Sequence, residues 1–132
     1  MSEGNVEIVR RFYEAWARGE FPGPPELMDP AIEYVNPAGA VEPGIRRGLA
    51  AFGAAVDKVF EGWATWEMEP ERFEEVGDRV AVIVRYRARA RSSGLEVEGR
   101  ESALWTVRDG RIIRYEWFHE AGDAGRAAGV YE

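Results

Sequence analysis

The sequence has no cysteine, one histidine (His119) and one lysine (Lys58) among its 132 residues. Without cysteine there is no disulfide, no thiol nucleophile and none of the commonest zinc sites. One histidine also excludes a metal site built from several imidazoles. A carboxylate site for Mg²⁺ or Ca²⁺ would need an acidic motif, and none stands out. We therefore expect neither a metal nor a cofactor.

Long apolar runs and an excess of positive charge are also missing. No segment reaches the roughly 20 apolar residues that a membrane helix needs, and the opening "MSEGNVEIVRR" has no apolar run typical of a signal peptide. The net charge of −7 would repel a phosphate backbone. The sequence therefore predicts a cytoplasmic protein that binds neither nucleic acid nor membrane.

The composition is that of an ordinary globular protein, with 45% hydrophobic and 31% charged residues. We expect a single domain over residues 1–132. Apolar residues recur at helical spacing over 5–18 and 49–61. Between them lie a proline-rich segment with room for one helical turn, a short strand over 31–36 and a loop rich in glycine and proline.

The second half of the chain changes to the alternating pattern of strands. Strands are predicted over 64–76, 79–91, 95–107 and 111–120, separated by short turns that contain glycine. Such strands form an antiparallel meander. Helices that precede an antiparallel sheet predict an α+β fold in which the helices pack on one face. The tail, 121–132, is expected to form a short helix over one edge of the resulting cone.

Alternation along the strands predicts which side chains face the helices. The predicted inner wall carries aromatic side chains with polar tips, which suits a site for a small apolar molecule. The alternative is that these residues only fill the core. The predicted ligand contacts are Phe12, Trp16, Tyr34, Asn36, Phe52, Tyr86, Trp105, Tyr115 and Trp117.

The outer face of the sheet is predicted to carry a row of arginines. These arginines could form cross-strand ion pairs with Glu96, Glu98 and Glu116. Alternatively, the face could be a homodimer interface whose register is set by charge pairs. The residues predicted for that interface are Arg85, Arg87, Arg89, Leu104 and Phe118.

Several motifs resemble the NTF2-like superfamily, and within it the SnoaL-like (polyketide cyclase-like) family. They are "VRRFYEAWARGE", a short strand that ends in "NP", and above all "GDRVAV" and "WTVRDGRIIR". The resemblance covers nearly the whole chain. It implies a cone in which a long curved antiparallel or mixed sheet wraps over about three helices. It also implies a deep apolar pocket for a small hydrophobic molecule, and frequent homodimers.

The ketosteroid isomerase branch of that superfamily has three catalytic positions that this chain does not keep. Phe12 stands where the branch has tyrosine, and Asn36 with Pro37 where it has its aspartate base. The branch's second aspartate falls near Ala103 or Ser102. Asparagine cannot act as the base and phenylalanine cannot donate to an enolate oxygen. Ketosteroid isomerase chemistry is therefore not expected.

Two ionisable residues of the predicted inner wall could replace that machinery, Glu101 and His119. A buried Glu101 would have a raised pKa and could act as an acid or a base. His119 could act as a general base. The alternatives are that Glu101 lies at the rim, paired with an arginine, and that His119 holds a backbone carbonyl at a strand end. Epoxide-hydrolase chemistry is set aside, since the predicted wall has no arginine and no aspartate.

Three functions follow from these features. The first is a cofactor-independent acid/base enzyme of isomerase, cyclase or hydratase type that acts on an apolar substrate. The second is a binding protein for a small hydrophobic ligand, with the same pocket but no titratable group at its centre. The third is a protein-interaction scaffold, for which the cone would be filled and the arginine face would bind a partner.

Overall fold

The computed structural model describes residues 4–129. Two long helices, a 3-10 turn and two strands come first: α1 (Asn5–Ala17), η1 (Pro25–Leu27), β1 (Met28–Asn36), β2 (Gly44–Arg47) and α2 (Leu49–Glu61). Four strands and a short helix follow: β3 (Trp63–Val76), β4 (Arg79–Ala90), β5 (Glu96–Arg108), β6 (Arg111–Phe118) and α3 (Asp123–Ala128).

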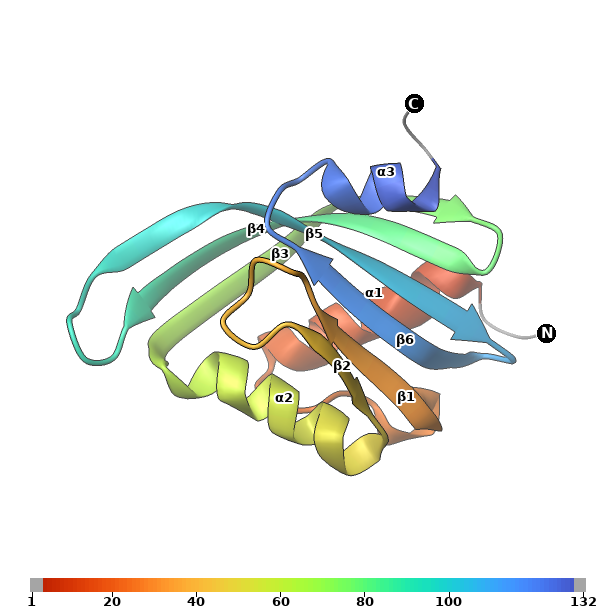
Figure 1. Ribbon diagram of the computed structural model, residues 1–132, viewed down its shortest axis with the longest axis horizontal. Coiled ribbons are helices and arrows are strands. Elements are labelled where there is room, and N and C mark those ends of the chain that lie inside the picture. Colours follow the sequence, from red (N-terminus) through yellow and green to blue (C-terminus); the bar gives the residue numbers. More distant parts are fainter. Residues whose placement is uncertain (1–3, 130–132) are drawn as a thin grey trace.

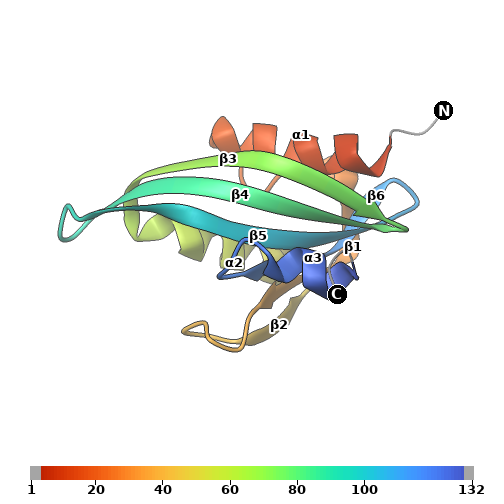
Figure 2. The same ribbon diagram turned by 90° about the horizontal axis from the view of Figure 1, so that it is seen from above.

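All six strands lie in one sheet, in the order β2-β1-β6-β5-β4-β3. The strand pairs are antiparallel except β1–β6, which is parallel, so the sheet is mixed. The long strands β3, β4 and β5 curve over α1 and α2, while α3 lies on the opposite side of the sheet (Figures 1 and 2). The α+β arrangement predicted from the sequence is confirmed.

The main core lies between α1, α2 and the concave face of the sheet. The buried side of α1 carries Ile8, Val9, Phe12, Tyr13, Ala15 and Trp16, and α2 adds Phe52 and Val56. Their counterparts on the sheet include Val80, Val82 and Trp105. The indole Nε1 of Trp16 donates a 2.7 Å hydrogen bond to the carbonyl of Pro22, which fixes the loop after α1 against this core.

The short helix α3 packs on the outer face of the sheet. Its Ala124 and Ala128 form a second small core with Ala81 and Leu104. Ser102, which is fully buried, fastens the helix: its hydroxyl donates to the carbonyl of Glu120 at 2.6 Å and accepts from the backbone N–H of Ala124 at 3.0 Å. The predicted tail helix exists but covers the back of the sheet rather than an edge of the cone. Residues 130–132 of that prediction lie outside the described residues.

This packing corrects the predicted dimer face. Leu104 is only 2% exposed and Phe118 packs against the same small core, so Leu104 is not available to a second copy. The arginine row does form cross-strand ion pairs, Arg89–Glu96 at 2.5 Å and Arg87–Glu98 at 3.9 Å. The third prediction in this set, a pairing with Glu116, is wrong, because Glu116 pairs with Arg114. The homodimer itself stays a prediction.

Two local features differ from the sequence prediction. Strand β2 pairs with β1 inside the segment predicted to be a loop. A register shift between Thr106 and Val107 makes Val107 the partner of Ile112. The buried isoleucine of β6 is therefore Ile112, whereas strict alternation from Tyr115 had placed Ile113 on that face.

No helix within residues 4–129 has the length and apolar character needed to cross a membrane.

Candidate functional site

A cavity of about 790 Å³ opens between α2 and the concave face of the sheet. Its wall combines residues from α1, α2 and every strand except β4, together with residues 39–42 of the loop after β1. The volume lies in the range of small-molecule sites, which are mostly apolar with a few placed polar groups. The described residues of this wall fit that pattern.

Part of the predicted ligand contact set lines this cavity. These residues are Trp16, Tyr34, Asn36, Tyr115 and Trp117. The two catalytic candidates, Glu101 and His119, line it as well. Whether any of them binds a ligand stays a prediction.

The other predicted contacts lie behind the wall. Phe12, Phe52 and Trp105 are fully buried in the core, and the indole of Trp105 donates a 3.1 Å hydrogen bond to the hydroxyl of Tyr13. Tyr86 stacks on Trp66 with ring centroids 5.8 Å apart and supports that side chain from outside the cavity. Alternation placed Trp105 on the correct face of the sheet, but there it packs against Phe12 of α1, with ring centroids 5.1 Å apart, instead of facing the cavity.

One row of side chains crosses the sheet into the cavity. Arg46 of β2 is the register partner of Tyr34 of β1, and Tyr34 is the partner of Tyr115 of β6. Tyr115 in turn pairs with Trp105 of β5. Because register partners on one face lie side by side, this row runs from a cation at the edge of the sheet, past two phenols, to the aromatic core.

Glu101 is the ionisable group of the inner wall. It sits on β5 opposite Val84 and is half-buried, with the cavity beside it. Within residues 4–129, no group forms a hydrogen bond or an ion pair with its carboxylate. Burial raises the pKa of Glu101 to about 7. The carboxyl group therefore exchanges protons readily near neutral pH, which suits a general acid or base. The predicted alternative, a rim position paired with an arginine, is wrong.

The charge of Glu101 influences the pKa of three buried tyrosines. Burial raises the pKa of Tyr13, Tyr34 and Tyr115 well above the usual value, and the charge of Glu101 raises each further. All three phenols are therefore protonated donors at neutral pH. Among the described residues, neither Tyr34 nor Tyr115 has a hydrogen-bond partner for its hydroxyl, and both line the cavity. These two hydroxyls are free to bind an oxygen of a ligand.

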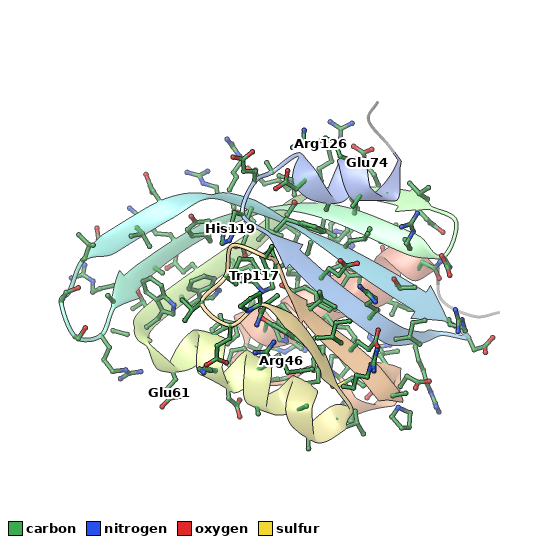
Figure 3. The ribbon with its side chains drawn as sticks, in the orientation of Figure 1. Arg46, Glu61, Glu74, Trp117, His119 and Arg126 are labelled. Carbon is green, nitrogen blue, oxygen red and sulfur yellow. The ribbon has the colours of Figure 1, made fainter. Side chains whose placement is uncertain are left out.

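His119 lies at the rim rather than in the interior. It follows the end of β6 and is exposed, next to the loop after β1 (Figure 3). Its ring packs edge-on against Trp117 at 4.9 Å, and a Cβ added to Gly39 would lie 3.4 Å from its Nε2. No backbone carbonyl within residues 4–129 accepts from it, contrary to the predicted alternative. Its position is that of a group at the entrance.

Both ends of the Asn36 side-chain amide form hydrogen bonds within the protein. Its Oδ1 accepts from Nε1 of Trp117 at 2.6 Å, and its Nδ2 donates to the carbonyl of Glu42 at 2.8 Å. The chain therefore needs an amide here to link β6, β1 and the loop over residues 37–43. The polar residue on the inner face of this short strand orients a wall of the cavity.

The charged mouth of the cavity was not predicted from the sequence. Arg46, Lys58 and Glu42 line it, and Glu42 accepts from both cations. This corrects the assignment of a wall without arginine. The lining still has no aspartate, so an Asp–Arg–Asp arrangement is absent from the described residues. Arg46 could have been found only by recognising β2.

The apolar end of the cavity, which β3 and α2 form, was not predicted from the sequence either. Trp63, Trp66 and Met68 of β3 lie there beside Phe60, and Trp66 packs edge-on against Phe60 at 5.7 Å. The signal was the alternation of Trp66 and Met68, which Pro70 interrupts. The indole Nε1 of Trp66 is buried without a partner among residues 4–129.

The described residues contain no group of three or more His, Asp or Glu side chains close enough to hold a metal ion.

Comparison with known proteins identifies the class. Residues 9–115 match the SnoaL-like domain family, so the chain belongs to that family. An uncharacterized protein of Mycobacterium tuberculosis is 29% identical over 120 residues, which is 89% of each chain. An uncharacterized protein of Mycobacterium bovis matches to the same extent.

Solved structures share the fold. An NTF2-like protein of unknown function from Burkholderia pseudomallei has a TM-score of 0.78 and 25% identity, covering 92% of this chain and 95% of that one. A putative SnoaL-like polyketide cyclase from Jannaschia has a TM-score of 0.75 and 23% identity, over 97% and 93%. TerC, co-crystallized with polyporic acid, has 0.77 and 23%, over 95% and 98%. The NTF2-like cone and SnoaL-like membership predicted from the sequence are confirmed.

Proposed function

We propose that the protein binds a small, largely apolar molecule in the cavity and that Glu101 exchanges a proton with a carbon atom of that molecule, without a cofactor. The observation that carries this proposal is the unpartnered, half-buried carboxylate of Glu101 beside an aromatic cavity. A carboxylate that only stabilised the fold would have a donor or a cation next to it. A cytoplasmic location stays a prediction.

The surrounding groups complete an acid/base site. The ionised Glu101 takes a proton from a carbon next to a carbonyl, and the electron pair moves to the carbonyl oxygen. The hydroxyl of Tyr34 or Tyr115 donates a hydrogen bond to that oxygen, where negative charge develops. The proton then returns from Glu101 to the same or a neighbouring carbon. This sequence covers the isomerase type and the first step of the cyclase type.

The second candidate, a binding protein without catalysis, uses the same cavity. It is favoured by the exposed position of His119, because among residues 4–129 this leaves Glu101 without a second carboxyl or imidazole group on the inner wall to share the acid/base steps. The scaffold alternative expected a filled cone, which a cavity of about 790 Å³ does not fit.

Hydrogen–deuterium exchange separates the two. An aryl ketone such as tetralone is incubated in D₂O with the protein, and loss of the proton signal next to the carbonyl is followed by NMR. We expect the wild type to accelerate exchange and Glu101→Gln to lose about 100-fold of that acceleration. Glu98→Gln is the matched control, because Glu98 lies on the outer face of the same strand, next to Arg87. Equal exchange by wild type and Glu101→Gln, with binding intact in both, would leave only the binding function.

A further inference from the structure

The mouth of the cavity has more positive than negative charge, although the whole chain carries −7. Arg46 and Lys58 are its cations and Glu42 is its carboxylate. Lys58 donates directly to Glu42, so the charges of these two residues offset each other. The charge of Arg46 is then in excess. The other acidic group of the lining, Glu101, is held mostly in its neutral form below about pH 7 by its burial. The mouth therefore attracts an anion.

Arg46 is the cation best placed to receive it. Its side chain is 28% exposed, against 64% for Lys58, so its charge is less screened by water. It donates to the carbonyl of Pro43 and to Glu42, both at 3.3 Å, which is long for charge-assisted hydrogen bonds. A guanidinium has more N–H groups than these two contacts use. The others have no acceptor among residues 4–129.

The arginine and Glu101 line the same cavity, and the charge of both acts on Tyr34. Arg46 is the register partner of Tyr34, and its charge lowers the otherwise raised pKa of that phenol. The charge of Glu101 has the opposite effect and raises the pKa of the same phenol. Arg46 and Trp117 lie within the space framed by α2, β2 and β6, whereas Glu74 and Arg126 lie by α3 (Figure 3). A ligand held by Arg46 would extend past Tyr34 toward Glu101.

We propose that Arg46 is a specificity-determining residue that binds a carboxylate, and that the ligand of this cavity is an aromatic carboxylic acid. The fork of a guanidinium matches a carboxylate in a bidentate geometry. The apolar body of such an acid fits against Trp16, Trp66 and Met68, which line the rest of the cavity. This inference rests on the proposed function, because it names the class of molecule that the cavity accepts.

The test uses two ligands of the same shape. The neutral fluorophore N-phenylnaphthylamine reports occupancy of the cavity, and naphthaleneacetate or naphthaleneacetamide displaces it. The two competitors differ only in carboxylate against amide. We expect the acetate to displace the fluorophore from wild type at about tenfold lower concentration than the amide. Arg46→Gln should remove that preference, and Arg46→Lys should retain part of it.

Arg47→Gln is the matched control. Arg47 is the next residue of β2 but points to the other face, where it pairs with Glu33 at 2.7 Å. We expect this variant to keep the wild-type preference and Arg46→Gln to bind the neutral fluorophore within about twofold of wild type. Thermal unfolding of each variant checks that it is folded.

The outcomes separate this inference from the function on which it rests. If the fluorophore does not bind the wild type, the cavity is not a binding site, and both proposals are overturned. If it binds but acetate and amide displace it equally, only the carboxylate inference is overturned. If Arg46→Gln and Arg47→Gln lose the preference alike, general surface charge accounts for it, and the role of Arg46 is overturned.

Discussion

The indole of Trp117 and the amide of Asn36 form a 2.6 Å hydrogen bond across the parallel pair of β6 and β1. The other end of the amide holds the carbonyl of Glu42. Since Trp117, Asn36 and Glu42 all line the cavity, this contact sets the shape of the wall before any ligand arrives.

Replacing Asn36 by aspartate tests this link. The carboxylate would still accept from Trp117, but it would face the carbonyl of Glu42 without a donor. We expect Asn36→Asp to lower the free energy of unfolding by about 1–2 kcal/mol in urea titrations and to speed protease cleavage within residues 37–43. Asn5→Asp is the control, because Asn5 makes only a 3.5 Å contact with Gly77. A loop cleaved no faster than in the control would contradict the link.

The pKa of Glu101 predicts how stability depends on pH. Burial raises that pKa to about 7, whereas it is near 4.3 in an unfolded chain. Between these values the folded state binds more protons than the unfolded state, so this residue's contribution to stability falls as pH rises. It is fully present below about pH 4 and lost above about pH 7.

Glutamine at position 101 should abolish that loss. We expect Glu101→Gln to gain stability relative to wild type as pH rises from about 4 to 8, by up to about 3 kcal/mol. Urea unfolding at several pH values measures the difference. Glu98→Gln, on the exposed side of β5, should show no comparable trend. A constant difference between Glu101→Gln and wild type across this range would mean that the carboxylate is not desolvated.

The contacts of Glu42 predict the rate at which the cavity opens. Lys58 of α2 and Arg46 of β2 both bind its carboxylate, which ties residues 37–43 across the mouth. We expect Glu42→Gln to release N-phenylnaphthylamine about threefold faster in stopped-flow measurements, with stability lowered by less than about 1 kcal/mol. Glu96→Gln removes a comparably exposed ion pair with Arg89, away from the cavity, and should leave the rate unchanged. Equal rates in all three proteins would argue against a closing role.

The approach of Gly23 to Phe12 predicts a sensitive position in the core. A Cβ at residue 23 would lie 2.5 Å from Cε2 of the buried Phe12 ring, and the backbone there has φ +145°, which disfavours a side chain. We expect Gly23→Ala to cost about 2 kcal/mol in chemical denaturation. Gly62→Ala is the control: nothing lies within 4 Å and φ is −79°, so its change should stay within about 0.5 kcal/mol.

The sequence was sufficient for most of the fold because its periodicities are strong. Helices at 5–17 and 49–61 and the four long strands follow patterns of 3.6 and 2 residues that burial enforces. Alternation also placed Glu101 on the inner face. It could not show the register shift between β5 and β6, which skips Ile113 of β6, because a bulge depends on the partner strand.

The candidate site was less predictable. Periodicity gives the face of a residue but not its depth, so it does not distinguish the cavity wall from the core between the helices and the sheet, where Phe12, Phe52 and Trp105 are fully buried. Strand β2 is too short to show a period of two, and Gly44 and the prolines before it favour a loop. Arg46 was missed with it. The most informative polar residue at the mouth therefore came from the segment with the weakest sequence signal.

Strand β2 also sets the proposed recognition residue, Arg46, apart from the core of the fold. It is the outermost strand, held to the sheet only through β1 along Gly44–Arg47, yet it carries Arg46. The buried side chains of Tyr34, Tyr115 and Trp105 are held in place by β1, β6 and β5. Exchange of residues 37–47 between relatives could therefore change which molecule is accepted while the rest of the cone is preserved. A change of residue at this edge of the sheet would leave the buried core of the cone untouched.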